Sequence, residues 1–85
     1  MRIPTIHLNG SPIQHIYDGL GEAAYRLTEA IGAVLKAGPN ARDYYVQGPE
    51  AFREAADEHI ARLAKLQAVA SELEAIFSAV CAQDQ

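Results

Sequence analysis

The sequence predicts an all-α protein, an antiparallel two-helix hairpin with a short extended N-terminal arm that oligomerises into a helical bundle. Two long segments, residues 11–37 and 49–82, carry apolar residues at alternating spacings of four and three, the 3.5-residue period of packed helices. A loop at residues 38–48, opened and closed by Gly-Pro pairs, separates them. With 85 residues, the chain is long enough for one domain at most, so we treat 1–85 as a single domain.

The arm, residues 1–10, has a different pattern. Ile6 and Leu8 alternate with polar residues, and Pro4 and Gly10 bound the alternating stretch, which is typical of an extended segment. Two interpretations are open. Either Ile6 and Leu8 pack over an open end of the bundle, or the arm is an exchanged strand that pairs with another subunit or a partner.

The first helix has a clear start signal. Ser11 is placed to cap the helix, Pro12 suits the first helical position, and Gln14 stands where a capping box requires it. Gly38-Pro39 ends the helix. The apolar residues that should face the other helix, the first seam, are Ile13, Tyr17, Leu20, Ala24, Leu27, Ile31 and Val34.

The second helix is expected to begin with Pro49 at its first position. Glu50 and Glu54 follow in the first turn, where the helix dipole favours acidic residues. Its apolar residues, the second seam, are Phe52, Ala56, His59, Leu63, Leu66, Ala70, Leu73, Phe77 and Val80.

Both seams are flanked by further apolar residues that two helices alone cannot cover. We therefore expect self-association, most simply a four-helix bundle made from two hairpins. The flanking residues are Ile16, Ala23, Ala30 and Leu35 on the first helix, and Ile60, Val69 and Ile76 on the second.

Charge and composition exclude several classes of partner. The net charge is −4, and residues 38–85 carry the whole excess, with four bases against eight acids. A nucleic-acid-binding protein needs a basic stripe, and a helix that binds anionic lipid needs a basic face; the sequence has neither. Cys81 is the single cysteine, and we find no signal peptide or membrane span. We expect a soluble intracellular protein.

The loop holds the candidate binding residues. Arg42 can make forked contacts to an anion or carboxylate, and Tyr44 and Tyr45 offer flat faces for stacking. Such a cluster suits a protein interface or a nucleotide-like anion, but the tyrosines can equally cover the open bundle end. The candidate residues are Asn40, Arg42, Asp43, Tyr44, Tyr45 and Gln47.

No pattern predicts an enzyme, a cofactor or a metal. His59 lies in the second seam, but the residue three before it is Ala56, whereas di-metal bundles use Glu-x-x-His, so a hydrogen-bonded core histidine is favoured. Gly19 and Gly21 lie inside the first helix and permit close packing or a bend. The acidic stripe Glu50, Glu54 and Glu58 is expected to be solvated.

Two stretches resemble short proteins encoded by bacterial phages and prophages: His7-Leu8-Asn9-Gly10-Ser11, and Pro39-Asn40-Ala41-Arg42-Asp43-Tyr44-Tyr45 with Gln47-Gly48-Pro49. Ala41 departs from the glycine expected between Asn40 and Arg42. The resemblance implies a phage-type protein acting inside a bacterial cell, and it brings no activity or site residue.

Three functions fit that context. The first is a non-enzymatic helical protein that oligomerises and binds, as a phage assembly accessory or as an inhibitor of a host protein. The second is an anti-defence sponge that sequesters a nucleotide signal through the loop. The third is a structural virion component. The expected partners are therefore the chain itself, a host or phage protein and, in the second case, a small nucleotide.

Overall fold

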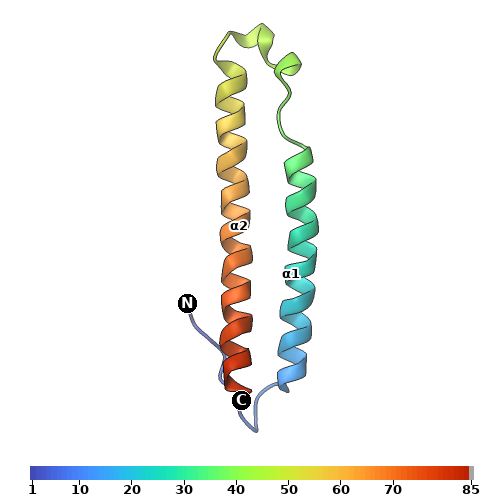
Figure 1. Cartoon of the computed structure of the whole chain (residues 1–85), viewed down its shortest axis with the longest axis vertical. Helices are drawn as coiled ribbons and strands as arrows, with labels where there is room; N and C mark the ends of the chain where they lie inside the picture. The colour runs from blue at the N-terminus through green and yellow to red at the C-terminus, as the bar shows by residue number, and fades with distance from the viewer. Residues whose placement is uncertain (85) are drawn as a thin grey trace.

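The computed structural model describes residues 1–84, which form two long antiparallel helices joined by two short 3₁₀ turns (Figure 1). No strand occurs within residues 1–84. The prediction of an all-α hairpin is confirmed. In chain order the elements are α1 (Ile13–Lys36), η1 (Ala41–Asp43), η2 (Tyr45–Gln47) and α2 (Ala51–Gln83).

The start of α1 differs from the prediction. The residue before the helix is Pro12, with φ −57° and ψ 142°, and no side chain caps the first turn. Gln14 does not reach back as a capping box requires, because its amide nitrogen donates to Oδ1 of Asp18 at 2.8 Å, one turn further along. The predicted Ser11 capping box is therefore wrong, and the helix begins two residues later than expected.

The start of α2 is also later than predicted. Gly48 and Pro49 belong to a turn in which the backbone N–H of Ala51 donates to the Gly48 carbonyl, and Glu50 precedes the helix without a side-chain cap. Pro49 is thus not the first helical residue. Glu54 does lie in the first turn, as expected, and α2 continues to Gln83, one residue beyond the predicted end.

The two seams face each other along the hairpin. All seven residues of the first seam are half-buried, and in the second seam only Phe52 and Phe77 are slightly more exposed, at 37% and 36%. The rings of Tyr17 and Phe77 lie 5.0 Å apart, and His59 contacts the Val34 carbonyl, so the pairing register is the same at both ends. Among the described residues, Val80 is the only one that is fully buried.

The hairpin is long and thin. Its dimensions are 62 × 20 × 18 Å and its radius of gyration is 18.8 Å. A compact domain of this length has a radius of gyration of about 12 Å. Because the helices lie side by side with nothing above or below them, most side chains reach solvent on one of two broad faces.

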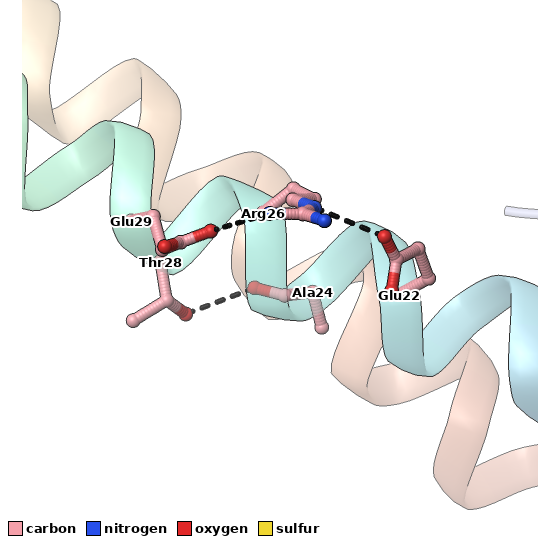
Figure 2. A network of polar contacts seen from close by, with 5 residues as sticks. All are labelled: Glu22, Ala24, Arg26, Thr28 and Glu29. Carbon is pink, nitrogen blue, oxygen red and sulfur yellow. Dashed lines mark hydrogen bonds and ion pairs between the residues drawn. The ribbon is translucent and has the colours of Figure 1, made fainter.

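The outer surface of α1 is polar, and its charged side chains form ion pairs with one another. Arg26 contacts Glu22 at 2.9 Å and Glu29 at 3.2 Å, and all three side chains are more than half exposed (Figure 2). Exposed pairs at helical spacing contribute about 0.3–0.5 kcal/mol each. This surface is therefore a solvated one.

The N-terminal arm lies against the end of α2 (Figure 1). The Gln83 side-chain amide accepts from the Ile6 backbone N–H at 2.9 Å and donates to the Pro4 carbonyl at 2.7 Å, as a neighbouring strand would. Ile6 is half-buried, but the chain turns after it and leaves Leu8 98% exposed. Leu8 therefore does not pack over the bundle end, whereas the half-burial of Ile6 agrees with that interpretation.

Replacing each of two glycines by alanine should change the stability of the protein in opposite directions. Gly48 has φ 118°, a conformation that strains any residue with a Cβ, so Gly48→Ala should cost about 1–3 kcal/mol of stability. Gly19 lies on an exposed helical surface with open space around its position, so Gly19→Ala should add about 0.5–1 kcal/mol. Urea denaturation followed by circular dichroism measures both. Equal stability of the Gly48→Ala variant and the parent would contradict the backbone conformation described here.

Candidate functional site

The 38–48 loop is an ordered pair of turns at the far end of the hairpin from the two termini (Figure 1). The Asn40 side chain accepts from the Arg42 backbone N–H at 3.1 Å, and the Asn40 carbonyl accepts from the Asp43 N–H at 3.0 Å. A second turn follows at once, in which the Gln47 N–H donates to the Tyr44 carbonyl at 2.9 Å. Asn40, one of the candidate binding residues, is therefore a turn-forming residue.

The two adjacent tyrosines have different environments. Tyr44 is half-buried, and its ring lies 6.4 Å from that of Phe52 on the first turn of α2. Tyr45 is 74% exposed, and so is its neighbour Val46, at 77%. The structure thus divides the pair: Tyr44 covers the bundle end, and Tyr45 is free to contact a partner.

The remaining candidates of the loop, Arg42, Asp43 and Gln47, are all exposed. The side chains of these three residues form no ion pair or hydrogen bond with another described residue. The structure therefore brings Arg42, Tyr45 and Val46 onto one short exposed segment. Val46 was not among the sequence candidates, because an isolated valine in a loop has no pattern that distinguishes it from a buried one.

His59 is a hydrogen-bonded histidine of the seam, as predicted. Its Nε2 lies 2.7 Å from the Val34 carbonyl oxygen and its Nδ1 lies 3.1 Å from Nη1 of Arg62. Since a guanidinium can only donate, Nδ1 is the acceptor and Nε2 carries the proton. The ring thus connects α2 to the last turn of α1 and also holds the Arg62 side chain.

The other end of the hairpin holds the most perturbed titratable group. The Tyr17 hydroxyl lies 3.5 Å from Oδ2 of Asp84 and next to the thiol of Cys81. A hydrogen bond with Cys81, then burial and the nearby negative charge, raise the pKa of Tyr17 to about 12. A tyrosine of that pKa is a poor general base near neutral pH. Within residues 1–84 no three histidine, cysteine or acidic residues are grouped as a metal site would need.

One face of the hairpin is hollowed between the helices. The groove has a volume of about 360 Å³ and lies nearer the termini than the loop. Sequence reasoning did not find it, because it arises where small residues of both helices meet across the seam. Its lining residues are Leu20, Gly21, Ala24, Thr28, Ala70, Leu73, Glu74 and Phe77.

No known protein family, curated protein or solved structure matches this chain. Within residues 1–84, neither helix combines the length and apolar character needed to cross a membrane.

Proposed function

We propose that this chain is a non-enzymatic helical protein that self-associates and binds a partner protein through the 38–48 loop. The observation that carries the loop assignment is the contrast between Tyr44, held against Phe52, and the exposed Tyr45 and Val46 beside it. The segment is fixed in place yet presents an aromatic and an aliphatic side chain to solvent. Tyrosine and arginine are the residue types that dominate protein interfaces, and a fixed segment loses little entropy on binding.

A protein partner is favoured over a nucleotide by the charges around the loop. Asp43 lies within it, the exposed Glu50 directly precedes α2, and the exposed Glu54 lies in the first turn of that helix. These carboxylates oppose the binding of a phosphate group beside Arg42, whereas a protein interface tolerates both signs. The resemblance to phage proteins supports a host or phage protein as the partner, and it leaves a virion component and a nucleotide sponge as alternatives.

Self-association is supported by the surface area of the hairpin. Its solvent-accessible surface is 6507 Å², and only Val80 is fully buried within residues 1–84. A compact monomer of 9.2 kDa exposes about 4,900 Å², so this hairpin exposes roughly a third more. Burial of about 800 Å² per copy, the area of a standard interface, would remove a large part of that excess.

Single substitutions should separate binding from folding. Arg42→Ala and Tyr45→Ala should each weaken partner binding by at least about 2 kcal/mol, a factor of roughly 30, and leave helicity unchanged. Tyr44→Ala should instead lower the melting temperature, because it removes the contact with Phe52. The assay is quantitative capture from a phage-infected bacterial lysate, followed by titration of the purified captured protein.

Tyr25→Ala is the matched control, because Tyr25 is a tyrosine of similar exposure, 59%, on the surface of α1. It should bind the captured protein as the parent does. Full binding by Arg42→Ala and Tyr45→Ala would exclude the loop as the binding site.

A thermal-shift screen of cyclic and linear nucleotides tests the alternative function as a nucleotide sponge. A ligand at a hundred times its Kd adds about 2.7 kcal/mol of stability. Stabilisation lost in Arg42→Ala would replace the protein-partner proposal with the sponge.

A further inference from the structure

The broad face that carries the groove has an unusual distribution of side chains. In the 3.5-residue repeat, the positions that flank both seams on this side are Gly21, Thr28 and Leu35 on α1 and Arg53, Ile60, Gln67 and Glu74 on α2. We call this surface the groove face. From it we infer how two copies of the chain associate, and the inference rests on the self-association proposed above.

The lining of the groove is mostly apolar, and Glu74 is its one charged residue. Leu20 and Leu73 line it, and apart from Gly21's own stretch of helix no atom lies within 4 Å of the place where a Cβ on Gly21 would stand. Its one hydroxyl is already satisfied, because Thr28 Oγ1 donates to the Ala24 carbonyl at 2.9 Å (Figure 2). The groove therefore suits aliphatic side chains.

Two aliphatic side chains project from the same face nearer the loop. Leu35 is 64% exposed and Ile60 is 65% exposed. They are the residues that follow Val34 and His59, which are in direct contact across the seam, so they stand at the same level of the hairpin. Together they form a projecting apolar pair on a helical surface that a monomer would leave in water.

The projecting pair lies about 15–16 Å from the middle of the groove along either helix, as it must when two antiparallel helices pair in one register. From Leu35 to Ala24 is about 16 Å along α1, and from Ile60 to Ala70 is about 15 Å along α2, at 1.5 Å per residue. Consider a two-fold axis that runs perpendicular to the helices, at the level of Thr28, midway between the projecting pair and the groove. Rotation about this axis places Leu35 and Ile60 of each copy over the groove of the other copy. The geometry points to an antiparallel dimer of hairpins in which the second copy inserts Leu35 and Ile60 into this groove and receives the first copy's pair in its own.

Charge supports the same arrangement. The axis that places Ile60 of one copy over Ala70 of the second copy also places Arg53 within one helical turn of Glu74 on the second copy. By symmetry, the dimer contains two such Arg53–Glu74 pairs. Both side chains are on the groove face, and neither forms an ion pair within the described part of the chain. Opposite charges at this spacing select the antiparallel register, because a parallel dimer would place them about 30 Å apart.

The opposite face offers a weaker receptor. Its flanking residues include the small Ala23 and Ala30, Val69, which is 46% exposed, and Arg62, which is held against His59. Ile16 and Ile76 of that face are already half-buried within one hairpin. It therefore presents no projecting pair that matches a hollow.

Light scattering on the full chain and on two aspartate variants tests the inference. The parent should be a dimer at micromolar concentration, and Leu35→Asp should raise the dimer dissociation constant at least about 100-fold, since each dimer loses two buried leucines. Val69→Asp, the matched control on the opposite face, should leave the dimer intact. A monomeric parent overturns both the inference and the proposed self-association. A dimeric parent that survives Leu35→Asp but not Val69→Asp overturns the inference alone.

A charge exchange tests the register independently of any effect on folding. Arg53→Glu and Glu74→Arg should each raise the dissociation constant about 10-fold, and the double variant should return to within about 3-fold of the parent. Failure of the double variant to recover affinity contradicts the pairing of these two residues.

Cross-linking tests the position of the axis. In a Cys81→Ser background, Thr28→Cys should form a disulfide between copies under mild oxidation, because the two Thr28 positions lie close together on opposite sides of the axis. Ala30→Cys on the opposite face should not. Cross-linking through Ala30→Cys and not through Thr28→Cys would place the interface on the other face and overturn the inference.

Discussion

Leu66→Ala should lower the free energy of unfolding by at least about 2 kcal/mol. Leu66 lies near the middle of α2 in the second seam and is half-buried against α1. Removing its isobutyl group takes apolar contacts from the only interface that joins the two helices, and the straight helix backbones cannot close the space. For a small protein of marginal stability this is a large fraction of the total.

Leu8→Ala is the control for that experiment, since it deletes the same group from a residue that is 98% exposed. Its effect should stay within about 0.5 kcal/mol. Urea denaturation at one fixed protein concentration compares the two, because the stability of a self-associating chain depends on concentration. Equal effects of the two substitutions would mean that the seam does not hold the hairpin together.

Val80→Asp should have a still larger effect and unfold the end of the hairpin near the termini. Val80 is 0% exposed, and it lies one helical turn before Gln83, where the arm joins α2. An aspartate there buries a carboxylate without a partner, which costs on the order of 3–5 kcal/mol. The expected result is a loss of helicity by circular dichroism at neutral pH.

Val69→Asp is the matched control, because Val69 on the same helix is 46% exposed and an aspartate there remains hydrated. It should keep the helicity of the parent. Val80→Asp with an unchanged melting temperature would show that the arm, α1 and α2 are not packed together at this end.

The helical hairpin and its two seams follow from the sequence alone. Spacings of four and three place residues such as Leu20, Leu27, Leu66 and Leu73 on one side of a helix whatever the rest of the chain does, and the Gly-Pro pairs break the helical pattern locally. His59 was predictable for the same reason: its place in the seam put it in the interior, where a polar ring needs hydrogen-bond partners.

The helix starts could not be predicted to the residue. Ser11 and Pro49 are good capping signals, but competing local contacts decide the outcome, as when Gln14 bonds to Asp18 and Gly48 to Ala51. Leu8 is a similar case. Its alternation with polar residues predicts a half-buried strand, yet the chain turns after Ile6 and carries Leu8 into solvent.

The sequence by itself determined which side of each helix is apolar, because helical periodicity is a property of neighbouring residues. Only the tertiary structure decided which of the candidate loop residues are exposed and which lie against α2. No sequence pattern distinguishes Tyr44 from its neighbour Tyr45. The path of the chain from the loop into α2 places Phe52 beside Tyr44 and leaves Tyr45 exposed. The groove likewise exists only where Gly21 and Ala24 meet Ala70 across the hairpin. Gly21 and Ala24 are 49 and 46 positions away from Ala70 in the sequence, so their proximity depends on the register of the two helices. No local pattern encodes the hollow that this register leaves.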